Sequence, residues 1–558
     1  MPVKSNTSRL SDTLRQQIVF DGTSSPVKTA LFVIICLAWT LPGLIGHDPW
    51  KPEEAIAFGT IYDLLSGGDW LVPGIAGVPY LESPPFFTWI GAIFASIFSP
   101  LLSLHDGARL TSAMFLAITM VCTALAAIRL FDERAARICV LMLIGSLGLL
   151  LRAHEITPQL APFAGMSIAL YGLVRIHKDA RNGSILMGIG SGLTGLSGGI
   201  VPALLLFIIP IVLASWQRDW LKRETLNALG HALLIAIPCA FFWPALLLLR
   251  GDLPASAWLA AATGVHALSP GGRPFEATYF IRLLTWYALP ALPVALWVWW
   301  RDRKLLRERF ELALPLVSFV VLLLGFSLFR EARDDMALPL LLPLILAAAH
   351  GIDRLPRGLA SFVDWFGMVT FFLFATLLWT GWTAAHTGAP PAAARWVARQ
   401  APGYAHQISW LLFGLALALT FIWLFAVFRT RRTNRRAIVN WAAGITLIWM
   451  LGNLLWLPAI DHVRSYRSTA AAIKAALPAE RQCVAQIGLG DAQRAAFDYH
   501  AGLRFIPATD ASHIHCDTLI VQGARDREPV LGPAWSLLWQ GARPGDNFEH
   551  FRLYRKSG

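Results

Sequence analysis

The sequence predicts a polytopic α-helical membrane protein with a small α/β domain at its C-terminal end. Of the 558 residues, 56% are hydrophobic and only 15% are charged, whereas soluble globular chains are about one quarter charged. Apolar runs of about spanning length recur along the chain, and Lys and Arg gather in the short segments between them. This composition excludes an ordinary soluble enzyme and a disordered chain, and it makes the net charge of +12 a topology signal rather than a sign of nucleic-acid binding.

The apolar runs predict about thirteen membrane crossings. The first run, Thr29–Ile45, follows a polar and basic segment, so we expect residues 1–28 to be a cytoplasmic tail. The remaining runs are 86–104, 108–128, 137–152, 160–176, 184–216, 229–249, 278–299, 311–329, 335–351, 362–385, 408–428 and 436–456.

Basic connections orient these runs, because short loops rich in Lys and Arg stay in the cytoplasm. We place in the cytoplasm the connections Arg129–Arg137, His177–Arg181, Arg218–Arg223, Arg301–Arg309, Arg354–Arg357 and Arg429–Arg436. The run 184–216 must then be two helices that turn at Leu196–Gly199. The run 86–104 must be re-entrant or lie along the outer interface, since a full crossing there would put Arg129–Arg137 outside.

The chain therefore divides into the tail 1–28, a membrane domain 29–456 with a large first outer loop 47–107, and an outer α/β domain 457–558. Within the last domain we expect strands at Cys483–Ile487 and Cys516–Val521, a short helix at Asp491–His500 and a closing strand at Phe548–Arg555. Its two cysteines either form a disulfide, as an oxidising compartment would allow, or stay as unpaired buried thiols.

The first outer loop holds the strongest candidates for chemistry. Glu53 and Glu54 follow Pro52 at the start of a predicted helix, where acidic residues also simply complement the helix dipole. The functional interpretation is that a carboxylate at the membrane face acts as general base on an acceptor. Glu82, before Pro84 and Pro85, has the same two interpretations.

Other predicted outer loops also bring ionisable side chains to this face. They are Arg152, His154 and Glu155 in one short loop, His266 in another, and the segment Arg330–Asp335 in a third. Charged groups at a membrane face mark function more often than charges on a soluble surface do. Gly488 and Gly490 follow a strand, but the third glycine of a dinucleotide fingerprint is missing, and no Walker motif or zinc-spaced cysteine pair occurs. We therefore expect no nucleotide.

Several of these segments resemble one known family. They are Lys51–Ala55, Ser66–Trp70, Tyr80–Pro85, Arg109–Leu110 and Ala337–Leu340. Together they resemble the membrane-embedded GT-C glycosyltransferases, in particular the bacterial aminoarabinose-transferase-like group related to protein O-mannosyltransferases. The resemblance covers nearly the whole membrane part and includes the outer α/β tail. It implies a GT-C fold in the bacterial inner membrane, with a cytoplasmic N-terminus and a periplasmic C-terminal domain.

The resemblance also implies roles for individual residues. Glu53 and Glu54 take the place of the family's acidic pair, and Glu82 and His266 fall where members hold a divalent metal such as zinc, magnesium or manganese. In our own hypothesis Glu53 is the catalytic base, with Glu54 or Glu155 assisting it. Residues expected to bind substrate or the lipid phosphate are Lys51, Tyr80, Arg152, Arg273, Arg330 and Arg333. The chain departs from the family at six positions. The family has Asp at Glu53, Arg at Ile56 and Lys at Ser83, with Asp near Gln159, Lys near Gly198 and Tyr near Met336.

Our leading hypothesis is an inverting transfer of a sugar, 4-amino-4-deoxy-L-arabinose among the candidates, from a polyprenyl-phosphate carrier to lipid A or another envelope acceptor. The chain would act as a monomer among membrane lipids, without nucleic acid. The alternative is a catalytically weak or inactive relative that binds or flips lipid. A secondary transporter ranks third, because no internal symmetry of interrupted helices is visible.

Overall fold

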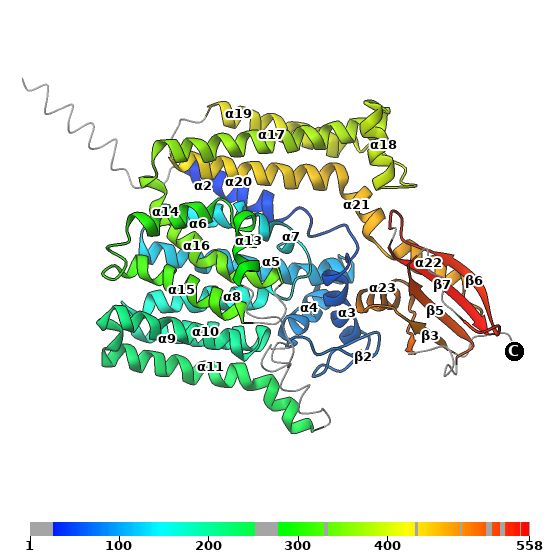
Figure 1. The fold of residues 1–558 in the computed structure, drawn as a ribbon, viewed down its shortest axis with the longest axis horizontal. Coiled ribbons are helices and arrows are strands. Elements are labelled where there is room, and N and C mark those ends of the chain that lie inside the picture. The colour runs from blue at the N-terminus through cyan, green and yellow to red at the C-terminus, as the bar shows by residue number, and fades with distance from the viewer. Residues whose placement is uncertain are drawn as a thin grey trace, which may run out of the picture.

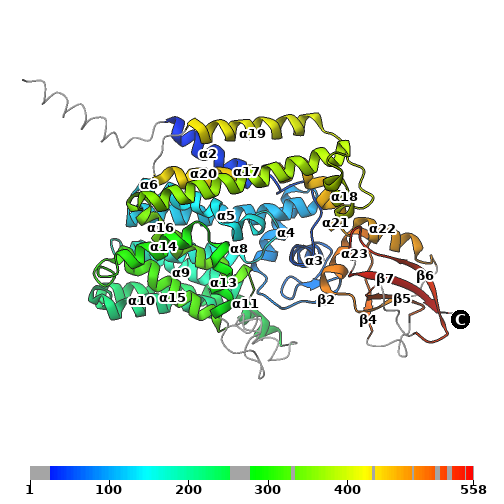
Figure 2. The same ribbon diagram turned by 45° about the horizontal axis from the view of Figure 1, so that its top comes forward.

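The structure, a computed structural model, describes residues 26–251, 277–328, 333–429, 434–479, 483–508, 516–524, 531–546 and 548–556. Long, roughly parallel helices form one part of the molecule and a β-sheet with flanking helices forms the other (Figure 1). The first outer loop, with α3 (Glu53–Leu65), β1 (Gly74–Ile75), β2 (Val78–Pro79) and α4 (Phe86–Phe98), lies between the two parts (Figures 1 and 2).

The membrane part contains helices of very different lengths, most of them apolar. They are α2 (Pro26–Thr40), α5 (Leu104–Leu130), α6 (Glu133–Gly145), α7 (Leu147–Arg152), α8 (Leu160–Ile176), α9 (Ala180–Gly198), α10 (Ile200–Trp216), α11 (Arg223–Arg250), α13 (Ala277–Tyr287), α14 (Ala291–Arg301), α15 (Phe310–Ser327), α16 (Leu338–Gly351), α17 (Arg357–Thr387), α18 (Pro391–Gln400), α19 (Trp410–Arg429) and α20 (Asn434–Leu451). A π-helical turn, Gly452–Trp456, follows α20 and leads into α21 (Leu457–Arg464).

Within the described residues, 7 helices are long and apolar enough to cross a membrane, or up to 8 if α13 and α14 count as one bent span. Shorter apolar helices lie at Thr29–Thr40, Phe86–Phe98, Leu160–Ile176 and Ile200–Trp216. A multi-pass membrane protein is therefore confirmed. The figure of about thirteen crossings stays a prediction, because it depends on which of the shorter helices also cross.

One local prediction for the membrane part is confirmed. The run 184–216 breaks into α9 and α10 at Gly199, whose φ of 92° belongs to the left-handed region that favours glycine. Helix α4 has 13 residues, fewer than the roughly 20 needed for a full crossing, and the re-entrant or interfacial placement of 86–104 stays a prediction.

The run 278–299 is not one continuous helix, and the structure leaves it as either a broken span or a re-entrant loop. Helices α13 and α14 meet at 110° over a break that contains Pro290. Proline cannot donate the backbone hydrogen bond of a continuing helix, and it disfavours helical geometry in the residue before it. The sequence did not predict this bend, because the run is apolar on both sides of the break.

Close packing of α8, α9 and α11 depends on small residues. A Cβ atom on Gly172 of α8 would come within 2.3 Å of the backbone nitrogen of Met187 in α9. On the other side of α9, a Cβ on Gly192 would lie 2.5 Å from Cβ of Cys239 in α11. Small side chains let helix backbones approach in membranes, where van der Waals contact is the main attraction between helices.

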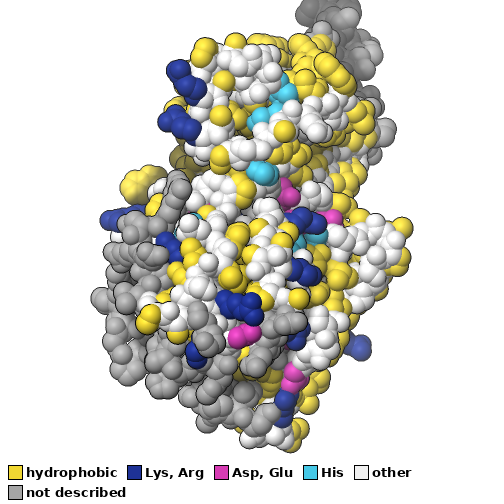
Figure 3. Space-filling view, turned by 90° about the vertical axis from the view of Figure 1, so that its right-hand side faces the viewer, with side chains coloured by type: hydrophobic (Ala, Val, Ile, Leu, Met, Phe, Trp, Pro, Cys, Tyr) yellow, Lys and Arg dark blue, Asp and Glu magenta, His cyan; other side chains and the backbone are white. Residues whose placement is uncertain are grey.

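The C-terminal domain is a mixed sheet with two helices, α22 (Arg467–Ala476) and α23 (Asp491–Ala501). Its strands are β3 (Val484–Ile487), β4 (Ile506–Pro507), β5 (Thr518–Gly523), β6 (Trp535–Gly541) and β7 (His550–Lys556). The strand order is β4-β3-β5-β7-β6; β3 is parallel to β4 and β5, while β7 is antiparallel to β5 and β6. Figure 3 looks onto the end of the molecule that carries this domain.

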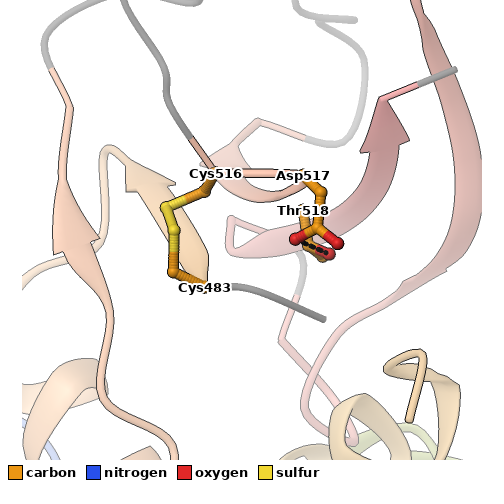
Figure 4. The surroundings of a disulfide bond; sticks show 4 residues. All are labelled: Cys483, Cys516, Asp517 and Thr518. Atoms are coloured by element: carbon orange, nitrogen blue, oxygen red, sulfur yellow. Dashed lines mark hydrogen bonds between the residues drawn. A yellow bond between two sulfur atoms is a disulfide. The ribbon is translucent and has the colours of Figure 1, made fainter. Parts of the chain in front are cut away.

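The predicted strands at 483–487 and 516–521, the helix at 491–500 and the closing strand at 548–555 are all confirmed. Strand β6 was missed, because its sequence faces solvent over most of its length and does not show a buried strand pattern. Cys483 and Cys516 form a disulfide with Cα atoms 5.0 Å apart, at the edge of a small apolar cluster with Leu519 and Tyr554 (Figure 4). Of the two alternatives for these cysteines, the structure has the disulfide.

Candidate active site

A cavity of about 520 Å³ opens where the first outer loop meets the membrane helices and the start of α23. Its described wall is unusually acidic for a site expected to bind a phosphate: the ionisable lining residues are Glu53, Glu82, Arg333, Asp334, Asp335 and Asp491. Apolar lining residues such as Met166, Phe326 and Pro339 complete the wall on the membrane side. The cavity wall can thus contact both a charged group and an apolar chain of a ligand.

Glu53 stands at the first turn of α3 on the cavity wall. Its side chain is 51% exposed, and its nearest charged partner is Arg152, with Arg152 Nη2 3.6 Å from Glu53 Oε1. That distance is too long for a strong hydrogen bond. The carboxylate is therefore oriented by a cation but remains available to accept a proton from a molecule in the cavity.

Arg152, at the end of α7, is surrounded by three carboxylates. Its Nη2 donates to both oxygens of Asp334 at 3.0 and 3.1 Å, and its Nη1 lies 3.8 Å from Glu155 Oε2. Together with the contact to Glu53, the Arg152 guanidinium is shared by three acidic residues, and each of them comes from a different segment of the chain. The prediction that Arg152 binds substrate remains, but Arg152 is not on the cavity wall and its charge is already shared.

Glu54, one residue later, has a different environment. It is 1% exposed; its Oε1 accepts hydrogen bonds from Arg109 Nε at 2.7 Å and from the backbone of Ile156 at 3.0 Å, and its Oε2 accepts from Trp50 N at 3.0 Å. Burial opposes its ionisation, but Arg109, His47 and these N–H groups hold the pKa of Glu54 below its usual value. This geometry revises the prediction of an assisting base, because Glu54 is saturated with donors and does not reach the cavity.

Arg109 completes a buried ionic network beneath the cavity. It is 0% exposed and also donates to Asp106 Oδ1 at 2.8 Å and to the carbonyls of Leu44 and His47 at 3.1 and 3.2 Å. The resemblance included Arg109 without giving it a role. Its role here is to neutralise Glu54 and to tie α5 to the first loop.

Glu155, the third predicted catalytic residue, lies behind Arg152. Burial and the neighbouring Glu54 carboxylate raise the pKa of Glu155 to about 7, against the opposing effect of Arg152. Glu155 is not on the cavity wall. Because it can exchange a proton near neutral pH, it is placed to alter the charge around Arg152 rather than to touch a ligand.

Lys51 does not lie in the cavity, contrary to the role predicted for it. Its ammonium group forms an ion pair with Glu549, a buried residue of the C-terminal domain. Glu549 also accepts hydrogen bonds from Tyr466 Oη at 2.7 Å and Gln493 Nε2 at 2.6 Å. Lys51 therefore joins the first outer loop to the C-terminal domain.

Two further carboxylates strengthen this junction. Asp48 accepts from Ser465 Oγ at 2.5 Å and from Arg467 Nε at 2.9 Å. Asp461 in turn accepts from Asp48 N and from Trp50 Nε1, both at 2.9 Å. The segment that leads into Glu53 is thus held along its length by residues after the last membrane helix.

Tyr80, Glu82 and Arg333 form one edge of the cavity. Tyr80 hydrogen-bonds to Glu82, and burial and that carboxylate raise the pKa of the Tyr80 hydroxyl. Arg333 Nη2 lies 3.7 Å from Glu82 Oε2. Tyr80 and Arg333 therefore reach the predicted site, and both contact the residue expected to hold a metal.

The metal prediction gains no support from the described residues. Glu82 faces a cation, and within the described part of the chain no group of three or more His, Cys, Asp or Glu side chains could hold a metal. Its proposed partner His266 lies outside the described residues, as do Arg273 and Arg330. The metal site therefore stays a prediction, and no chemical step is assigned to a metal.

Sequence reasoning missed three cavity residues. Asp334 and Asp335 were recognised only as part of a mixed charge cluster, although they lie directly on the wall. Asp491 begins α23 in the C-terminal domain, about 430 residues from the first loop in sequence. It follows Gly490 in a segment that resembled an incomplete nucleotide motif, and only the packing of α23 against α3, with Ala495 beside Gly59, brings it to the cavity.

The positions at which the chain departs from the family lie on the wall of this one cavity. Besides Glu53, they are Ile56, Ser83, Gln159, Gly198 and Met336. They come from the first loop, α3, α8, α9 and the turn before α16. The departures therefore change the surface of a single binding site rather than scattered parts of the fold.

Comparison with known proteins shows which families the chain resembles. Residues 82–243 match the family described as dolichyl-phosphate-mannose-protein mannosyltransferase. The chain is 28% identical over 345 residues to the undecaprenyl phosphate-alpha-4-amino-4-deoxy-L-arabinose arabinosyl transferase of Pseudomonas aeruginosa (strain UCBPP-PA14), a match that covers 59% of this chain and 60% of the relative. The second enzyme of that name from Pseudomonas fluorescens (strain Pf0-1) is 27% identical over 58% of this chain and 59% of its own length.

A solved structure extends the likeness to the whole fold. The structure of ArnT from Cupriavidus metallidurans bound to undecaprenyl phosphate superposes with a TM-score of 0.71 at 18% identity, over 95% of this chain and 98% of that one. The protein is therefore a multi-pass membrane protein with the GT-C fold. Its sequence relatives are the undecaprenyl-phosphate aminoarabinose transferases, and the matched segment spans about 60% of their length. The family resemblance is confirmed.

Proposed function

We propose that the protein is an inverting glycosyltransferase that moves a sugar from a polyprenyl-phosphate carrier to a hydroxyl group of an envelope lipid such as lipid A. The observation that carries this proposal is Glu53, a half-exposed carboxylate on the wall of a cavity of about 520 Å³, oriented by Arg152 but without a close hydrogen-bond donor among the described residues. A positioned carboxylate of this kind can act as general base.

In the proposed reaction, Glu53 takes the proton of the acceptor hydroxyl as its oxygen attacks the anomeric carbon of the sugar. The bond between that carbon and the carrier phosphate breaks from the opposite face, and the phosphate leaves with the bonding electrons. Arg333, the one cation among the described lining residues, would stabilise the leaving anion. The apolar wall would receive the start of the lipid chain.

An amino sugar suits this cavity better than a neutral one. The described wall has five carboxylates and one cation, so a sugar with an ammonium group gains attraction that a neutral sugar lacks. The sugar named for the relatives, 4-amino-4-deoxy-L-arabinose, has such a group. We therefore take it as the first donor to test.

The C-terminal domain and the cavity would face the periplasm. The Cys483–Cys516 disulfide supports this orientation, because disulfides persist in oxidising compartments and are rare in the cytosol. The basic connections at the opposite ends of the helices agree with it. Reporter fusions at Arg432 and at Gly558 test it: the first should report cytoplasm and the second periplasm, and a cytoplasmic Gly558 would contradict the proposal.

A lipid-binding relative without turnover is the second candidate. It is favoured by Ile56 and Ser83 on the wall, where the family has cations, and by the carboxylates that already surround Arg152. Mass spectrometry of envelope lipids from cells with and without the gene separates the two, because only the enzyme adds a sugar.

Glu53→Gln tests the proposed base while it preserves the size of the side chain. Transfer by the purified protein should fall by about 10²–10⁴-fold, the usual contribution of a general base. Glu133→Gln is a matched control, since Glu133 is also an acidic first-turn residue, exposed at the start of α6 and absent from the cavity wall. Equal rates for Glu53→Gln and the wild type would remove Glu53 as the base.

A further inference from the structure

Helix α18 differs in orientation from the helices that it connects. It joins α17 and α19, both long and apolar enough to cross a membrane, and it lies across their ends rather than along them (Figures 1 and 2). These ends are on the side of the C-terminal domain. A connection between two neighbouring spans has to stay close to the membrane surface.

Tryptophan residues gather at the same level. Trp382 of α17 stacks on Phe413 of α19 with ring centroids 5.1 Å apart, and Trp410 at the start of α19 is 74% exposed. Trp396 of α18 is 55% exposed. Tryptophan is enriched where bilayer and water meet, so these rings place α18 at the headgroup level.

The two faces of α18 have opposite character. Val397 is 2% exposed and packs toward Gly381 of α17. Arg395 and Arg399 are both exposed, and residues four apart share one side of a helix. Neither arginine has an ion pair or hydrogen bond with any residue that the structure describes, and the helix itself contains no acidic residue. The upper part of Figure 3 shows Lys and Arg side chains standing out at the edge of this end of the molecule.

We propose that Arg395 and Arg399 bind the phosphate of an anionic membrane phospholipid, with Trp396 inserted beside the headgroup. Charge complementarity supports this occupant: two exposed cations at the headgroup level attract acidic lipids, and arginine suits phosphate geometry. No residue of α18 lines the cavity. The site is therefore separate from the proposed reaction and does not depend on it.

The test uses the full-length protein in nanodiscs made from equal amounts of phosphatidylglycerol and phosphatidylcholine. Native mass spectrometry of the released protein measures how strongly it retains phosphatidylglycerol over phosphatidylcholine. The double variant Arg395→Gln/Arg399→Gln should lower this preference by about thirtyfold, roughly fivefold for each cation near the surface. The variant Arg395→Lys/Arg399→Lys should keep most of it, because it keeps the charge.

A matched control removes two charges elsewhere. Arg555→Gln/Lys556→Gln changes two exposed cations at the end of β7 in the C-terminal domain and should leave the lipid preference unchanged. The proposal is overturned if the glutamine pair in α18 retains the wild-type preference, or if the control pair loses it equally. It is also overturned if millimolar inorganic phosphate displaces the lipid, since the site would then bind free phosphate. The melting temperature of each variant confirms that it is folded.

Discussion

The two sides of the start of α3 show how differently adjacent carboxylates can be used. Glu53 faces the cavity, is half exposed and has one cation at 3.6 Å. Glu54 faces inward, is buried, and is bonded to Arg109 and to two backbone N–H groups. A buried carboxylate whose oxygens all accept hydrogen bonds stabilises the fold. A carboxylate at a cavity with fewer hydrogen-bond partners can accept a proton from a ligand. The sequence Glu53-Glu54 contains both, and only their surroundings separate them.

The largest effect on stability is expected from a substitution in the buried ionic network around Glu54. Arg109→Met leaves Glu54 and Asp106 buried without their common cation, and breaking a buried ion pair in this way costs about 3–5 kcal/mol. We expect this loss in the free energy of unfolding of the detergent-solubilised protein. Arg175→Met is the control, because its pair with Asp179 lies on the surface and such pairs contribute about 0–1 kcal/mol. Similar losses for the two variants would mean that the Glu54 network is not structural.

Adding a positive charge to the cavity wall tests whether the carrier phosphate binds there. Ser83→Lys places a cation on the wall where the family has lysine, beside the expected position of the carrier phosphate. Binding of polyprenyl phosphate should strengthen by about 1.5–3 kcal/mol, as for a charged hydrogen bond. Titration with the carrier lipid measures this. Unchanged affinity would show that the phosphate does not reach this wall.

Glu155 predicts how stability depends on pH. Its pKa in the folded protein is raised to about 7 from its usual 4.5, so the folded state binds a proton that the unfolded state releases. Its contribution to stability is complete below about pH 4.5 and is lost as pH rises through about 7. Glu155→Gln should remove a loss on the order of 3 kcal/mol over this range. Melting curves between pH 4 and 8 that keep the wild-type slope in the variant would contradict the assignment.

The smallest effect is expected at the junction with the C-terminal domain. In Lys51→Met, Glu549 keeps its bonds to Tyr466 and Gln493, so we expect a loss of only about 1 kcal/mol in unfolding free energy. Affinity for the carrier should not change, because Lys51 is outside the cavity. A tenfold weaker affinity for the carrier would restore the phosphate-binding role that its sequence pattern suggested.

Sequence patterns predicted many of the individual helices, because helix signals depend on local composition. Apolar runs, basic loops and the glycines at 196–199 act over a few residues, and the structure agrees at α9, α10 and α4. The bend at Pro290 was missed because the surrounding run is uniformly apolar. Strand β6 was missed for the opposite reason, since an exposed edge strand lacks a buried pattern.

By itself, the sequence determined the membrane class, the resemblance to the GT-C fold, the C-terminal α/β elements and the pair Glu53-Glu54 as candidate carboxylates. Only the tertiary structure separated Glu53 from Glu54, moved Lys51 to Glu549 and brought Asp491 to the wall. The physical reason is that hydropathy and helix-start signals arise from neighbours in the chain. The environment of a charged side chain arises instead from partners such as Arg109 and Glu549, which are distant in sequence and become neighbours only when the chain is folded.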